Sequence, residues 1–141
     1  ELLDYDMHQK MQAYVRELNK LYEKYDAMYV NDCEPIGFEW MSCDNADMST
    51  VSFVRRGSSA KNQLLFVCNF TPVSYEKYRT GVPCAGDYVK VLSSDDEKFG
   101  GTGANIKKTI KAEKIECEGK DYSIEFNLPP MSVTVFKFDY K

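Results

Sequence analysis

The sequence has 141 residues, of which 43% are hydrophobic and 28% are charged, and its formal net charge is −4 at pH 7. This length suits one ordinary domain, and the composition is that of a folded globular protein rather than a disordered chain. Basic and acidic residues are interleaved without a basic stripe, which argues against a nucleic-acid partner, and no apolar stretch approaches the roughly 20 residues of a membrane-spanning helix.

The first element that the sequence predicts is an amphipathic α-helix over residues 6–25. Its apolar residues recur at spacings of three and four, which places them on one face of a 3.6-residue period. They are Met7, Met11, Tyr14, Val15, Leu18, Leu21, Tyr22 and Tyr25. Asp6 followed by Gln9 predicts a capping box at the start of this helix. The apolar face is broad enough to need a partner, either in this chain or in a domain outside it.

From residue 35 onward the pattern changes to that of β-strands. Alternating or continuous apolar runs predict strands at 36–41, 51–54, 64–70, 88–92, 122–128 and 133–140. Turn-forming residues separate the runs, and no helical pattern falls between them, which favours antiparallel pairing. We therefore predict an all-β fold, an antiparallel β-sandwich preceded by one N-terminal amphipathic α-helix.

The stretch VCNFTPVSYEKYRTGVP, residues 67–83, is predicted to leave a central strand and cross to a partner strand. Pro72 has no N–H to donate, so we expect it to end the strand ladder, and Gly81 suits a tight turn. The charged loop between them is expected to expose the rings of Tyr75 and Tyr78. Most other aromatic residues sit on strand patterns and are predicted to be core; these are Phe38, Trp40, Phe53, Phe66, Phe126 and Phe136.

The sequence offers little catalytic or metal-binding chemistry. Its single histidine, His8, lies on the predicted helix, far in sequence from any nucleophile signature or thiol. Five cysteines at irregular spacings, without a C-x-x-C motif, favour free thiols in a reducing compartment such as the cytoplasm. The glycine-rich run at 99–103 lacks the Lys-Ser/Thr of a phosphate loop, and the acidic run at 44–47 lacks the EF-hand spacing. We assign no catalytic, cofactor-binding or metal-binding residue.

Several motifs occur in a characteristic order along nearly the whole chain. They are LLDYDMHQKMQAYVRELNKLY at 2–22, GFEW at 37–40, NFTP at 69–72, YRTGVP at 78–83, FGGTG at 99–103 and LPP at 128–130. Together they resemble the C-terminal region of bacterial 1,4-α-glucan (glycogen) branching enzymes of the α-amylase superfamily. The resemblance implies a cytoplasmic enzyme of glycogen biosynthesis that transfers α-1,4-glucan segments to 6-hydroxyls through a covalent glycosyl-enzyme, without a cofactor.

The same resemblance implies a domain organisation. Residues 1–34 would be the last helix of a (β/α)₈ barrel that lies outside this chain, plus a linker, and residues 35–141 would be the C-terminal β-sandwich. The family's catalytic carboxylates belong to the barrel, so the isolated chain is expected to be inactive. The expected partners are α-glucan or glycogen, the enzyme's own barrel and a second copy of this chain, because an exposed apolar face favours self-association. Neither nucleic acid nor membrane is expected.

Two alternatives stay open at this stage. The chain could be an autonomous carbohydrate-binding module, which would present clustered exposed aromatic residues, although it has only one tryptophan. It could also be the matching domain of another amylase-superfamily enzyme, such as a debranching enzyme. The candidate contacts with glucan or with another domain are Trp40, Tyr75, Tyr78 and Arg79.

Overall fold

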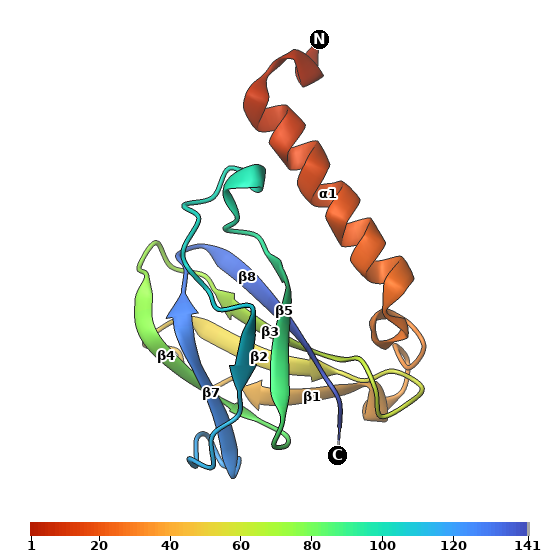
Figure 1. Ribbon diagram of the computed structural model, residues 1–141, viewed down its shortest axis with the longest axis vertical. Coiled ribbons are helices and arrows are strands. Elements are labelled where there is room, and N and C mark those ends of the chain that lie inside the picture. Colours follow the sequence, from red (N-terminus) through yellow and green to blue (C-terminus); the bar gives the residue numbers. More distant parts are fainter. Residues whose placement is uncertain (141) are drawn as a thin grey trace.

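The computed structural model describes residues 1–140, which form one long α-helix and two antiparallel β-sheets (Figure 1). The helix α1 spans Asp6–Lys24, close to the predicted 6–25. The strands are β1 (Phe38–Ser42), β2 (Thr50–Arg55), β3 (Gln63–Asn69), β4 (Tyr75–Val82), β5 (Asp87–Ser93), β6 (Thr109–Lys111), β7 (Tyr122–Leu128) and β8 (Ser132–Phe138). Single turns of 3₁₀ helix occur at Leu2–Asp4, Asp26–Met28, Pro35–Gly37 and Glu97–Phe99.

The larger sheet has the strand order β1-β2-β3-β8-β5-β6, and the smaller sheet pairs β4 with β7. In the centre, β3 and β8 pair along their whole length, from Gln63↔Phe138 to Asn69↔Ser132. The two sheets enclose a core of buried side chains that includes Leu65, Val67, Tyr78, Tyr88, Ile124, Phe126 and Phe136. The predicted all-β sandwich with one N-terminal helix is confirmed.

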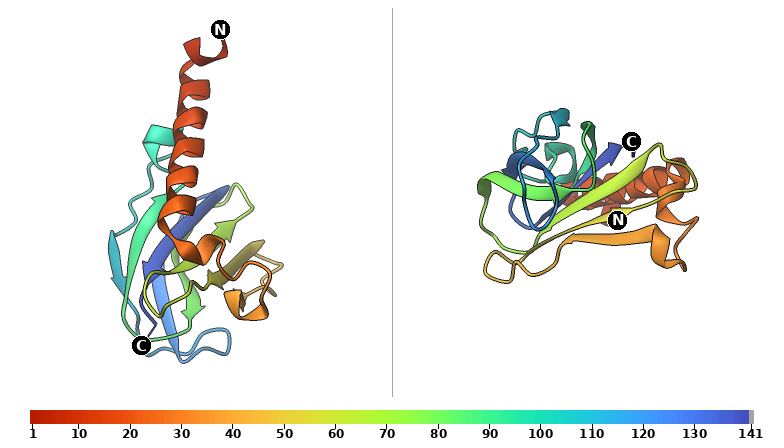
Figure 2. Two further views of the ribbon diagram at one scale, coloured as in Figure 1. Left: turned by 90° about the vertical axis from the view of Figure 1, so that its right-hand side faces the viewer. Right: turned by 90° about the horizontal axis from the view of Figure 1, so that it is seen from below.

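The second half of α1 packs on the outer face of the larger sheet. Leu21 and Tyr25 are buried there against Leu64 of β3, Leu92 of β5 and Val135 of β8. The first half of the helix extends beyond the end of the sheets, so that the N-terminus stands clear of the sandwich (Figure 2). Only part of the apolar helix face is therefore used within the described residues.

Hydrogen bonds fix the segment that joins α1 to the sandwich. The Asp26 carboxylate accepts the backbone N–H of Ser58 at 3.1 Å, and the amide of Asn31 donates to the carbonyl of Gly57 at 3.1 Å. Arg55 on β2 donates to the carbonyl of Met28 at 3.3 Å and to the Asp32 carboxylate at 2.5 Å. Because these contacts join the linker to the β2–β3 turn, α1 and the sandwich form one packed unit.

The prediction that residues 75–83 form a crossing loop is wrong, since this segment is the strand β4. It pairs with β7 from Tyr75↔Leu128 to Val82↔Tyr122, with an irregularity between Tyr75 and Tyr78. Gly81 lies inside this strand and not in a turn. A Cβ there would stand 2.6 Å from the Cys117 carbonyl oxygen, which explains why this strand position holds a glycine. The preceding strand β3 already ends at Asn69, before Pro72. The short strand β6 was not predicted either.

The predicted capping box is also absent. Tyr5 precedes the first residue of α1, and no side chain caps this helix end. The amide of Gln9 instead donates to the carbonyl of Leu3 at 2.8 Å, and Asp6 forms an ion pair with Lys10 at 2.8 Å. The start of the helix is thus stabilised by a turn folded back on its first residues.

Candidate functional site

A row of aromatic side chains crosses the outer face of the larger sheet. The strand register places Trp40 opposite Phe53 and Phe53 opposite Phe66. The Phe53 and Phe66 rings stack at 5.0 Å with an interplanar angle of 5°, and Phe38 stacks on Phe53 at 5.2 Å. Trp40 meets Phe38 edge to face at 4.8 Å. We call Phe38, Trp40, Phe53 and Phe66 the aromatic ladder.

The ladder corrects the prediction that these aromatic residues are core. Phe126 and Phe136 do lie between the sheets, but Trp40 is 50% exposed, Phe38 is 37% exposed, and Phe53 and Phe66 are partly buried. The strands β2 and β3 carry apolar residues on both faces, so alternation alone does not reveal which face points inward. The prediction of core packing is therefore wrong for Phe38 and Trp40, which are exposed, whereas Phe66 packs against the buried cluster beneath α1.

The apolar residues of α1 that do not touch the sheet form a second exposed surface. Met7, Met11, Val15 and Tyr22 are between 46% and 61% exposed. We call these four residues the open helix face. One flank of α1, with Glu17 and Lys20, lines a hollow with β5. The opposite flank, which carries Met11 and Val15, is therefore on the side of β2 and β3, where the ladder lies.

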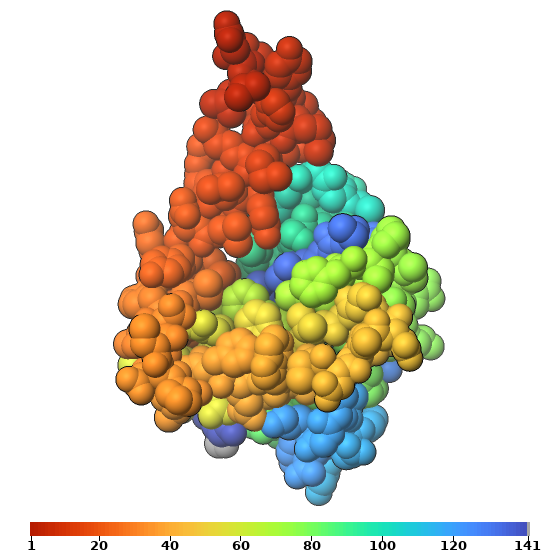
Figure 3. Space-filling model, turned by 180° about the vertical axis from the view of Figure 1, so that it is seen from behind, coloured from red at the N-terminus to blue at the C-terminus, as the bar shows by residue number. Residues whose placement is uncertain are grey.

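Seen from behind, the first half of α1 rises above the strands that carry the ladder (Figure 3). The charged residue of β1 lies on the other face of the strand, because Glu39 alternates with the ladder residues and is opposite the core residue Val54. Glu39 on β1 accepts a bond from Lys120 at 2.6 Å and forms a second ion pair with Arg56. The Arg56 guanidinium also lies 4.9 Å from the centre of the Tyr140 ring. The open helix face and the ladder thus form two neighbouring exposed apolar surfaces, as is typical of a protein interface.

The four candidate contact residues do not form one site. Trp40 projects from the outer face of the larger sheet, whereas Tyr75, Tyr78 and Arg79 belong to β4 in the smaller sheet. Tyr78 is 4% exposed, so the expectation of an exposed ring is wrong for this residue. Its hydroxyl donates to Thr50 Oγ1 at 3.0 Å, and burial raises the pKa of that hydroxyl.

The other two β4 candidates are held by neighbouring groups. The partly buried Tyr75 donates its hydroxyl to the carbonyl of Met48 at 3.0 Å. Arg79 forms ion pairs with Glu113 at 2.6 Å and Glu125 at 3.0 Å, and its hydrogen bond to Glu113 is the main cause of its raised pKa. Their polar groups therefore serve the packing of β4 on its neighbours.

The glycine-rich loop already holds an anion from this chain. The buried carboxylate of Asp95 accepts the N–H of Thr102 at 2.9 Å, the hydroxyl of Thr102 at 2.7 Å and the N–H of Ala104 at 2.9 Å. The hydrogen-bond donors of this loop that could bind a phosphate are therefore already bonded to the Asp95 carboxylate. Among residues 1–140, no three His, Cys, Asp or Glu side chains gather to form a metal site, and no helix is long and apolar enough to cross a membrane.

Residues 40–139 match the family of the α-amylase C-terminal all-β domain, and the chain belongs to this family. It is 45% identical over 140 residues to the 1,4-α-glucan branching enzyme GlgB of Butyrivibrio fibrisolvens, covering 99% of this chain and 22% of that enzyme. It is 43% identical to the enzyme of the same name from Pseudoalteromonas atlantica, covering 96% and 18%, and 41% identical to that from Geobacillus stearothermophilus, covering 96% and 21%. The chain spans about a fifth of the length of the curated relatives it matches.

Proposed function

We propose that this chain is the C-terminal domain of a cytoplasmic 1,4-α-glucan branching enzyme and that it stabilises the catalytic part of that enzyme. The supporting observation is the pair of apolar surfaces, the aromatic ladder and the open helix face, in which six large side chains are between 37% and 61% exposed. Each large apolar side chain moved from water into an interface contributes roughly 1.5–3 kcal/mol. Burial of these six partly exposed side chains would favour binding of a protein partner.

The proposed partner is the enzyme's own (β/α)₈ barrel, with residues 1–34 supplying its last helix and linker and residues 35–141 supplying the C-terminal sandwich. Two flanks of one helix then have different partners. Leu21 and Tyr25 pack on the sandwich, whereas Met11 and Val15 pack on the barrel. The hydrogen bonds of Asp26, Asn31 and Arg55 would transmit the position of the sandwich to the helix.

Catalysis is proposed to reside in the barrel, which transfers glucan segments without a cofactor, so that this chain alone is inactive. The test is a chimera in which the chain replaces the matching 140-residue segment of the Butyrivibrio fibrisolvens enzyme. We expect the chimera to branch amylose, read by loss of iodine colour, and the isolated chain to leave the colour unchanged. A soluble chimera without activity, or an isolated chain with activity, would contradict the proposal.

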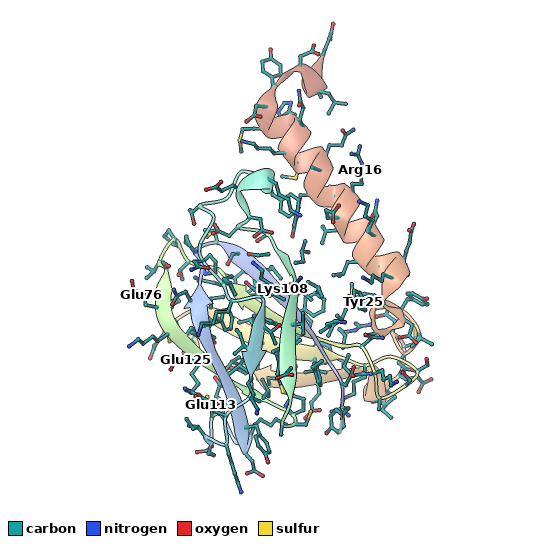
Figure 4. All side chains as sticks on the ribbon, in the orientation of Figure 1. Arg16, Tyr25, Glu76, Lys108, Glu113 and Glu125 are labelled. Carbon is teal, nitrogen blue, oxygen red and sulfur yellow. The ribbon has the colours of Figure 1, made fainter. Side chains whose placement is uncertain are left out.

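The docking surface is tested in the same chimera. Met11→Asp and Trp40→Asp each place a charge in the proposed interface and should lower its melting temperature and its activity together. The matched control is Arg16→Asp, since Arg16 is an exposed residue on the polar flank of the same helix (Figure 4). Equal losses from the control and from Met11→Asp would show that the open helix face has no special role.

Contact with glucan is a second candidate function, and the observation that favours it is the half-exposed indole of Trp40. The parallel stacking of Phe38, Phe53 and Phe66 covers their ring faces and leaves mainly edges, whereas sugars stack on open ring faces. Titration with maltoheptaose, followed by NMR at the Trp40 indole and at the amides of Tyr75, Tyr78 and Arg79, tests this function. Saturable shifts would support glucan holding, and unchanged spectra would leave only the stabilising role.

A further inference from the structure

We propose that a groove between β6 and β7 binds a phosphate group. The groove has a volume of about 370 Å³ and lies where the edge of the larger sheet meets the smaller sheet. Buried Ile110 and Phe126 form its floor. Its walls carry six exposed polar residues: Lys77, Asn105, Lys107, Thr109, Lys111 and Asn127.

The charge balance of the groove is opposite to that of the whole chain. Two carboxylates, Glu113 and Glu125, line it next to β7 (Figure 4), but both are paired with Arg79. The three lysines take part in none of the ion pairs found among residues 1–140. Three lysines and Arg79 against these two carboxylates give the groove and its immediate partner a net charge of +2, in a chain whose net charge is −4. This balance favours an anionic ligand.

The remaining hydrogen-bonding capacity also points to an anion. The oxygen of the Asn127 amide accepts the backbone N–H of Lys77 at 3.3 Å, which leaves the amide N–H₂ group as a donor. Together with the ammonium groups, the groove thus offers an excess of donors to a ligand rich in acceptor oxygens, as phosphate is. Phe126 is 6% exposed and presents no ring face for a sugar to stack on. A neutral glucan is the poorer match.

The experiment is an NMR titration of the 141-residue chain with inorganic phosphate at constant ionic strength, following the amides of Lys77, Thr109 and Lys111. Glucose 1-phosphate and maltoheptaose are titrated in parallel to separate free phosphate, phosphate carried by a sugar, and neutral sugar. We expect saturable shifts with both phosphates, and Lys111→Gln should weaken binding about three- to fivefold, as expected for the loss of one exposed charge pair.

Lys114→Gln is the matched control, because it removes the same charge from an exposed residue that does not line the groove. If only glucose 1-phosphate saturates, the proposal stands and the sugar contributes to binding. Absence of saturable shifts with both phosphates would overturn it, as would equal weakening by Lys114→Gln and Lys111→Gln. Saturation by maltoheptaose alone would overturn it in favour of a neutral glucan. The groove is separate from the ladder, so none of these results depends on barrel docking.

Discussion

At the scale of single residues, Asp95 explains how a loop rich in glycine keeps a defined shape. Its carboxylate collects the three donors from Thr102 and Ala104, while its own carbonyl lies so close to Gly101 that a Cβ there would approach it to 2.1 Å. The loop then presents Phe99, whose ring meets Tyr14 of α1 edge to face at 5.2 Å. By holding the shape of this loop, the Asp95 carboxylate supports the contact between Phe99 and the helix.

Replacing Asp95 with alanine should destabilise the chain. The substitution leaves two backbone N–H groups and one hydroxyl without their acceptor, and bonds to a charged group contribute about 1.5–3 kcal/mol. We expect the free energy of unfolding in urea to fall by about 2 kcal/mol. Asp96→Ala is the control, because the Asp96 carboxylate makes only a 3.8 Å ion pair with Lys90 and should change stability by less than about 0.5 kcal/mol.

The cysteines should differ sharply in reactivity. Cys33 and Cys43 are exposed, whereas Cys68 is buried on the outer face of β3, and burial raises its pKa to about 11 from 9.0. A thiol-specific reagent at pH 8 should therefore label the two exposed cysteines rapidly and Cys68 only after unfolding. Rapid labelling of Cys68 in the folded chain would show that α1 does not cover this part of the sheet.

The same pKa shift has a defined effect on stability. A folded pKa above the unfolded one means that the unfolded chain loses the Cys68 proton first as the pH rises. The contribution of Cys68 is thus fully present below pH 9 and is lost as the pH rises toward 11. We expect Cys68→Val to show a smaller loss of unfolding free energy than the unsubstituted chain between these two pH values. Identical slopes for both chains would contradict this assignment.

At the scale of elements, the sequence predicts those whose apolar pattern decides their structure locally. The helix and the strands β1, β2, β3, β5, β7 and β8 all follow from periodicity. The strand β4 does not, because Glu76 and Lys77 interrupt its pattern and Lys77 adopts a left-handed conformation with φ of +53°. Its structure is set by pairing with β7, whose partner residues lie 40 to 53 positions further along the chain, from Val82↔Tyr122 to Tyr75↔Leu128. The aromatic ladder was missed for a related reason. The sequence does not show which face of a strand points toward the core, because this depends on how the two sheets pack against each other.

The two flanks of α1 should respond differently to the same substitution. Leu21 is 6% exposed and packs on the sheet, so Leu21→Ala should lower the free energy of unfolding by about 2–4 kcal/mol. Met11 is 61% exposed, and Met11→Ala should change it by less than about 0.5 kcal/mol in the isolated chain. Urea unfolding of both variants checks this contrast. A large loss from Met11→Ala would mean that its flank already has a partner within this chain.

At the scale of the whole molecule, the chain combines a well-packed sandwich with apolar surfaces that face solvent. The core is closed by two sheets and by the second half of α1, so the sandwich itself needs no partner. The open helix face and the aromatic ladder are different: Phe66 packs against that core, but Met11, Val15, Phe38 and Trp40 remain exposed to water. A surface of this kind either meets a partner domain or meets a second copy of the same chain.

We therefore expect the isolated chain to self-associate, with a sedimentation coefficient that rises with protein concentration. Val15→Asp should shift this equilibrium toward the monomer, because it would bury a charge in the contact, whereas Arg16→Asp on the polar flank should not. In the chimeric enzyme the same surface would be occupied by the barrel, and concentration-dependent association through it should disappear. An isolated chain that stays monomeric at all concentrations would mean that these side chains are too widely spread to form a contact by themselves. Association unaffected by Val15→Asp would instead place the contact elsewhere on the molecule.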